Sequence, residues 1–221
     1  MMETDINMEV VVPRYHPTVV LQDVIDVDRR LAELGFGTRD DIQRIRDVAC
    51  ARAAEGASPF FPLNGPGTLA FQYGTRELRA HLHGLGWKLD DSFGTSGMQH
   101  ADEPRLAFYQ NVDVACDLPH DPRPRTRKGA GAERLDQDVL FDPEGIPTAF
   151  DSEAAGREVW YVMVAENGAV EVTNAVVRKG WFAEIRERLF VEDGDGFDVV
   201  DPAGDLPADD AVDFDVPVLR R

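Results

Sequence analysis

The sequence contains little cysteine and little serine, and this removes several classes of site. The two cysteines, Cys50 and Cys116, lie far apart and outside any metal-ligand spacing, so neither a disulfide framework nor a cysteine zinc site is expected. Only four serines are present, and Ser96 lies in a Gly-Thr-Ser-Gly run that lacks one residue of the nucleophile-elbow pattern. The sequence therefore gives no support to a thiol or serine nucleophile.

Lysine is almost absent, with three lysines beside 20 arginines. A restriction-enzyme-like nuclease core needs a carboxylate two residues before a lysine, so that both groups reach one metal ion. None of the lysines has such a neighbour, which excludes this core unless another cation replaces the lysine. The residues two positions before Lys88, Lys128 and Lys179 are Gly86, Thr126 and Val177.

Longer motifs are also missing. The chain has no H-E-x-x-H or C-x-x-C pattern and no P-loop, because Lys128 precedes the nearby glycines instead of following them. No apolar run approaches the roughly 18 residues of a membrane helix, and no basic segment leads into an apolar one near residue 1. We therefore expect a cytoplasmic protein that does not span a membrane and needs neither a cofactor nor a metal ion.

Acidic residues are abundant, with 41 acidic against 23 basic side chains and a net charge of −18. This balance disfavours non-specific binding of nucleic acid or anionic lipid by the surface as a whole. Three explanations are open: adaptation to high salt or a generally acidic composition, a docking surface for a basic partner, and mimicry of a nucleic-acid backbone.

One loop concentrates positive charge in this acidic chain. It follows a predicted strand over residues 105–116, and its prolines favour an extended backbone that spreads the guanidinium groups. Arginine binds phosphate oxygens in a bidentate manner, and glycines before a helix allow close approach of a ligand. We predict an anion-binding or partner-binding site at this loop, although an exposed loop neutralised by the protein's own acidic surface is the simpler alternative. The site consists of Arg123, Arg125, Arg127, Lys128, Gly129, Gly131 and Arg134.

Two carboxylates beside this loop define an alternative function. Asp113 lies on the predicted strand and Glu133 follows the glycines, so together they are weak candidates for acid/base residues or metal ligands in an enzyme that processes phosphate esters. Asp113 is more simply explained as a hydrogen-bonded residue on a solvated face.

The periodicity predicts an α+β fold. Apolar residues at helical spacing predict helices over residues 20–34 and 38–55, which we expect to form an antiparallel helical hairpin. Gly35 is placed to end the first helix with a left-handed cap, and Thr38 with Asp41 comes close to a capping box at the start of the second. The pattern also predicts a shorter helix from Thr75, a β-hairpin over residues 158–177 with a type I′ turn at Asn167-Gly168, and a helix over residues 180–190. The sheet is expected to be mixed and mostly antiparallel. We expect Phe60 and Phe61, between prolines, to fold back over the helices; if exposed, they would form a contact surface.

The domain organisation predicted is one α+β domain over residues 1–191, with candidate subdivisions near residue 100 or at 141–156, followed by an acidic tail over 192–221. For function, the failure of every catalytic pattern and the segregation of charge favour a non-enzymatic binding or accessory protein. The basic loop is its predicted contact surface. Nucleic acid, another phosphate-bearing ligand, or a protein are the candidate partners.

Overall fold

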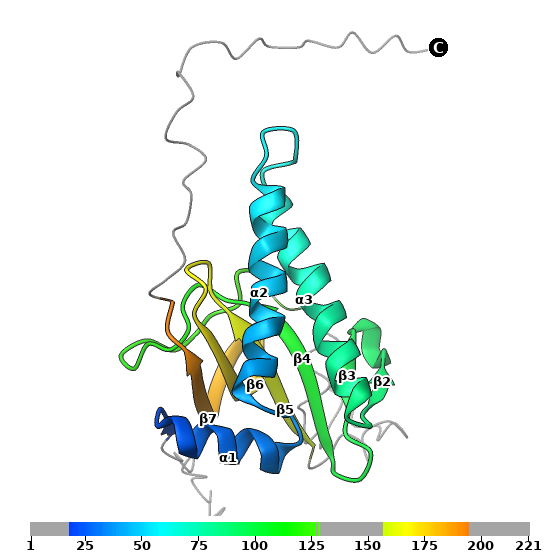
Figure 1. The fold of residues 1–221 in the computed structure, drawn as a ribbon, viewed down its shortest axis with the longest axis vertical. Coiled ribbons are helices and arrows are strands. Elements are labelled where there is room, and N and C mark those ends of the chain that lie inside the picture. Colours follow the sequence, from blue (N-terminus) through cyan, green and yellow to red (C-terminus); the bar gives the residue numbers. More distant parts are fainter. Residues whose placement is uncertain (1–17, 127, 129–156, 195–221) are drawn as a thin grey trace, which may run out of the picture.

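A seven-stranded mixed sheet, with helices packed on one face, forms the centre of the protein (Figure 1). The computed structural model describes residues 18–126, 128 and 157–194. The candidate subdivision at 141–156 and residues 195–221 of the predicted acidic tail lie outside these residues. The described strands are β1 (Val19–Leu21), β2 (Lys88–Asp90), β3 (Gly97–Gln99), β4 (Arg105–Asn111), β5 (Glu158–Val164), β6 (Val170–Arg178) and β7 (Trp181–Glu192).

The strand order is β1-β7-β6-β5-β4-β3-β2. β1 is parallel to β7 and β4 is parallel to β5, while the other neighbours are antiparallel. The predicted α+β class and the mixed, mostly antiparallel sheet are therefore confirmed. The predicted hairpin of residues 158–177 is also present as β5 and β6, but only Gly168 in its connection has a positive φ, so the turn is not of type I′.

The helix predicted over residues 180–190 is wrong, because these residues form β7. A tight turn at Lys179 and Gly180, whose φ angles are +54° and +79°, reverses the chain directly out of β6. Both central residues are left-handed, as a type I′ hairpin requires. The β6–β7 pairing then contains three register shifts. Such bulges reset the side-chain alternation, so the apolar residues of β7 imitate helical spacing instead of showing a period of two.

The α-helices of the described residues are α1 (Val24–Leu34), α2 (Arg39–Gly56) and α3 (Gly65–Gly84). The predicted left-handed cap at Gly35 and the capping box of Thr38 and Asp41 are both present. The first helix begins later than expected, because residues 19–21 pair with β7 instead. α3 begins ten residues before Thr75, since Pro66 occupies its first turn, where proline costs no hydrogen bond.

The helical hairpin is formed by α2 and α3, not by the first two helices. Figure 1 shows α2 and α3 side by side and antiparallel over the sheet, whereas α1 crosses below them. The far end of this hairpin extends past the sheet. α3 comes close to β4 because Gly74 has no side chain: a β-carbon there would lie 2.3 Å from the ring of Tyr109.

Apolar side chains are buried on both faces of the sheet. On the helix-covered face, Phe36 packs against Trp87 and Trp160, with ring centroids 5.4 and 6.4 Å apart. On the opposite face, a second cluster includes Phe108 and Tyr161, whose rings lie 5.8 Å apart. The second cluster places a buried surface beneath the segment 112–126, which carries part of the predicted site.

Candidate functional site

The segment 112–126 leaves β4 and returns to it as a closed loop. Val112 pairs with Pro124 in an isolated antiparallel bridge, and the Asp113 N–H donates to the Arg123 carbonyl at 3.0 Å. The Arg125 N–H then donates to the Asn111 carbonyl at 3.1 Å. The first part of the predicted basic loop is therefore fixed to the end of β4.

Asp113 holds this loop closed. One carboxylate oxygen, Oδ1, accepts the backbone N–H groups of Val114 and Arg123, each at 2.7 Å. This arrangement gives Asp113 a structural role in the turn. Glu133, its predicted catalytic partner, lies outside the described residues, and the described part of the chain contains no group of three side chains placed to hold a metal ion.

The basic side chains of the loop point in different directions. Arg123 and Arg125 are exposed, and Arg125 forms an ion pair with Glu166 at 3.2 Å. The Lys128 ammonium points inward, donates to Gln110 Oε1 at 2.7 Å and lies 4.3 Å from the centroid of the Tyr161 ring. Burial lowers the pKa of Lys128 to about 7. Lys128 thus does not share the outer surface of Arg123 and Arg125, and Arg127, Gly129, Gly131 and Arg134 lie outside the described residues.

A buried ion pair beneath the loop was not predicted from the sequence. The guanidinium of Arg188 on β7 donates to both carboxylate oxygens of Glu171 on β6, at 3.1 and 2.8 Å. Arg188 also donates to the Asp117 carbonyl, and Glu171 accepts the Cys116 N–H. Both side chains are almost fully buried, so the pair anchors the segment 112–126 to the sheet. Only strand alternation, which places Glu171 beside Thr173, could have suggested an inward carboxylate.

A cleft of about 730 Å³ opens where this segment meets the end of β7. Arg39 in its lining donates to the Val191 carbonyl and lies 3.7 Å from the Glu192 carboxylate. The thiol of Cys116 donates to the Val170 carbonyl, and burial raises its pKa to about 12. These contacts hold Arg39 and Cys116 against the backbone at the edge of the sheet.

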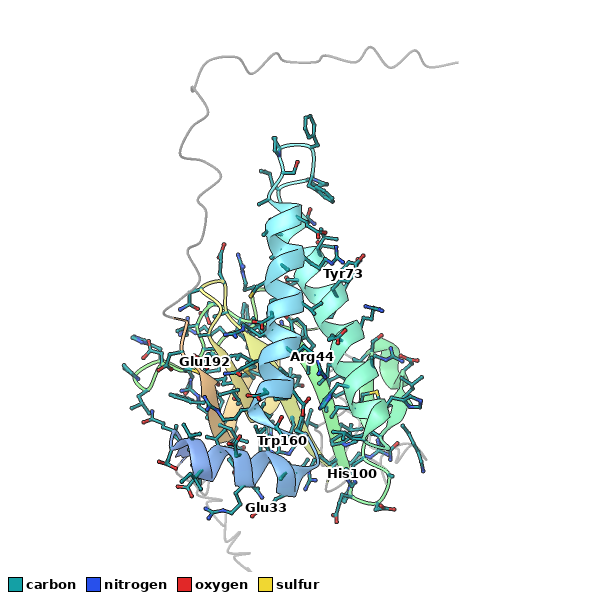
Figure 2. The ribbon with its side chains drawn as sticks, in the orientation of Figure 1. Glu33, Arg44, Tyr73, His100, Trp160 and Glu192 are labelled. Atoms are coloured by element: carbon teal, nitrogen blue, oxygen red, sulfur yellow. The ribbon has the colours of Figure 1, made fainter. Side chains whose placement is uncertain are left out.

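The most exposed apolar side chains lie at the far end of the α2–α3 hairpin, in the loop 57–64, which we call the tip. Phe60 is 95% exposed, Leu63 is fully exposed and Phe61 is 45% exposed. The expectation that the phenylalanines fold back over the helices is therefore wrong. Figure 2 shows side chains projecting outward from this end, beyond Tyr73.

The tip is held by backbone hydrogen bonds and by a close approach of the two helices. The Phe61 N–H donates to the Ser58 carbonyl at 2.9 Å, and the Gly65 N–H donates to the Pro62 carbonyl at 2.7 Å. A β-carbon on Gly56 would lie 2.8 Å from the carbonyl carbon of Gly65, so glycine is needed there. Prolines at positions 59, 62 and 66 restrict the backbone further.

The end of the hairpin is electrically neutral. Residues 48–75, which we call the distal hairpin, contain one basic and one acidic side chain, Arg52 and Glu55. These two are paired with each other, because the Arg52 guanidinium donates to both Glu55 oxygens at 2.6 Å. The rest of the chain is strongly acidic. The distal hairpin is therefore a neutral surface with apolar side chains at its end.

Comparisons with protein-family models, with curated proteins and with solved structures find no match to this chain. Among the described helices, none has the length and hydrophobicity that a membrane span requires.

Proposed function

We propose that this protein is a non-catalytic binding protein that contacts its partner through the distal hairpin. The observation that carries the proposal is the exposure of Phe60 and Leu63 on a neutral, hydrogen-bonded tip. Large apolar patches are rarely exposed on monomeric soluble proteins, and where they occur they often mark an interaction site. Aromatic enrichment together with depletion of charge is the composition of an interface core.

The apolar side chains of the tip would supply a moderate binding energy. Full burial of Phe60 and Leu63 and half burial of Phe61 corresponds to about 4–7 kcal/mol, at 1.5–3 kcal/mol for each fully buried side chain. Association costs at least about 4 kcal/mol in lost freedom of motion. A partner must therefore add apolar contacts of its own, and the expected complex is reversible.

The rigidity of the tip supports a binding role. Its prolines and backbone hydrogen bonds restrict the backbone that carries Phe60 and Leu63 before any partner arrives. A preorganised loop loses less conformational entropy on binding than a mobile one. A loop with no role in contact would gain nothing from presenting these side chains to water.

The described part of the basic loop is a second candidate contact surface. Arg123 and Arg125 are exposed on a segment that is anchored at both ends, and their guanidinium groups suit a phosphate-bearing ligand or an acidic protein. The alternative enzyme has less support, because Asp113 Oδ1 already accepts two backbone N–H groups.

Site-specific photo-crosslinking tests the proposal at the distal hairpin. The full chain, with p-benzoylphenylalanine in place of Leu63, is irradiated in the cells of its own host. Leu89 on β2 is the control, because it is also an exposed leucine (58%) and β2 lies beside the end of α3 that is opposite the tip (Figure 1). We expect discrete adducts from position 63 and none from position 89. Adducts at neither position, or the same adducts at both, would contradict the proposal.

A further inference from the structure

We infer that the partner of the distal hairpin is a second copy of this chain, with the two hairpins meeting end to end around a two-fold axis. This inference rests on the proposed contact surface. It identifies the occupant of that surface from charge, geometry and exposed area.

Charge restricts where two copies can meet. Each chain has a net charge of −18, so two copies repel each other overall and a contact is least opposed where the surface carries no unpaired charge. In the distal hairpin, the only charged side chains of residues 48–75 neutralise each other. The neutral part of α2 runs from residue 48 to Gly56, roughly 13 Å along the helix axis. A contact between two such ends therefore brings no unpaired charge of residues 48–75 into the interface.

Geometry provides a matching apolar residue for each tip. Phe71 on α3 is 45% exposed, and its ring is supported by Tyr109 at a centroid distance of 6.3 Å. It lies six residues into α3, roughly 9 Å along the axis from the start of the helix. When two hairpins overlap antiparallel by this length, the tip of each copy reaches Phe71 of the other. A two-fold interface requires this kind of reciprocal contact.

The available area predicts a weak dimer. Phe60, Phe61, Leu63 and Phe71 together expose about three side-chain equivalents, and an aromatic side chain buries about 150–250 Å². Two copies would therefore bury about 1,000 Å², at the low end of specific interfaces. A lipid surface is a poorer occupant, because a single acyl chain of comparable apolar area gives only marginal membrane binding. The acidic chain would also be repelled by anionic headgroups.

Sedimentation velocity on the purified full chain tests the inference, from low micromolar to near millimolar concentration and at low and high salt. We expect a reversible monomer–dimer equilibrium that strengthens as salt rises, because salt screens the repulsion between two chains that each have a net charge of −18. Leu63→Ser should weaken the dimer at least about tenfold, the equivalent of 1.4 kcal/mol. Leu89→Ser, the same change at an exposed leucine outside the distal hairpin, should leave the dimer unchanged. Urea unfolding verifies that both variants fold.

The outcomes separate this inference from the proposed function. A chain that remains monomeric at every concentration and salt, or a dimer that Leu63→Ser leaves intact, overturns the inference. If the chain is monomeric but the photo-crosslinker at position 63 gives adducts with another protein, the distal hairpin binds a different partner and only the inference fails. Binding of the wild type, but not Leu63→Ser, to phosphatidylcholine vesicles without dimerisation would also overturn it, in favour of lipid.

Discussion

Replacing Gly74 with alanine should destabilise the protein by overpacking the contact between α3 and β4. The added β-carbon would lie 2.3, 2.4 and 2.7 Å from three ring atoms of Tyr109. The ring cannot move aside freely, because Tyr109 is buried and its hydroxyl donates to Asn111 Oδ1 at 3.0 Å. Asn111 in turn donates to the Gly67 carbonyl at 2.8 Å. A shift of the ring would break this link between strand and helix.

The change in unfolding free energy caused by Gly74→Ala is the sum of two terms of opposite sign. Overpacking a well-filled core costs about 1–3 kcal/mol, whereas alanine is favoured over glycine inside a helix by about 1 kcal/mol. Gly67→Ala isolates the second term, since Gly67 is also in α3 but has no atom within 4 Å of its would-be β-carbon. We therefore expect Gly74→Ala to be about 1–3 kcal/mol less stable than Gly67→Ala.

Urea unfolding of the full chain, followed by tryptophan fluorescence, measures this difference. A double-mutant cycle with Tyr109→Leu provides the control, because removal of the ring should recover most of the loss caused by Gly74→Ala. If Gly74→Ala is as stable as Gly67→Ala, or if Tyr109→Leu does not recover stability, the close approach of α3 to β4 is not limited by this contact.

Three further outcomes follow from the buried groups. Arg188→Met should lower the free energy of unfolding by about 3–5 kcal/mol, because it leaves the Glu171 carboxylate buried without its cation. Arg29→Met, which breaks an exposed ion pair, should lower it by less than about 1 kcal/mol. Equal losses of stability in urea unfolding would contradict the role of the buried pair. Stability should rise with pH from about 7 towards 10.5, because the unfolded Lys128 still binds a proton that the folded state has released. In Lys128→Met the increase of unfolding free energy with pH should be smaller than in the wild type, by up to about 1.4 kcal/mol per pH unit. An identical pH dependence in the variant and the wild type would refute this prediction. Because burial raises the pKa of Cys116 to about 12, this thiol should react slowly with a disulfide reagent at mildly alkaline pH until the chain unfolds, and rapid labelling of the folded Cys116 would be inconsistent with its burial.

Much of the fold could be predicted because its signals are local. The cap at Gly35 and the capping box of Thr38 and Asp41 act through backbone groups only a few residues away, so the sequence reports them directly. The alternating runs of β5 and β6 are equally local. The pattern failed at β7, where bulges replace the simple period of two and pairing with β6 outweighs the helical spacing of the side chains.

The candidate site was much less accessible from the sequence. The basic loop could be recognised in the sequence, but the direction of the Lys128 side chain depends on Gln110 and Tyr161. These two residues lie on β4 and β5, which are separated from Lys128 along the chain and come close to it only in the fold. The pairing of Glu171 with Arg188 depends on the register between β6 and β7. Neither contact leaves a recognisable spacing in the chain.

The sequence alone determined the charge balance, the α+β class, the helix caps and the neutrality of residues 48–75, because composition and short-range hydrogen bonding do not depend on the rest of the fold. Only the tertiary structure decided which apolar residues meet water. Phe36 and Phe60 are the same residue type, yet Phe36 is enclosed between helices and sheet while Phe60 projects past them. Burial is a property of what lies across space from a side chain, and this is set by the packing of α2 and α3 over the sheet.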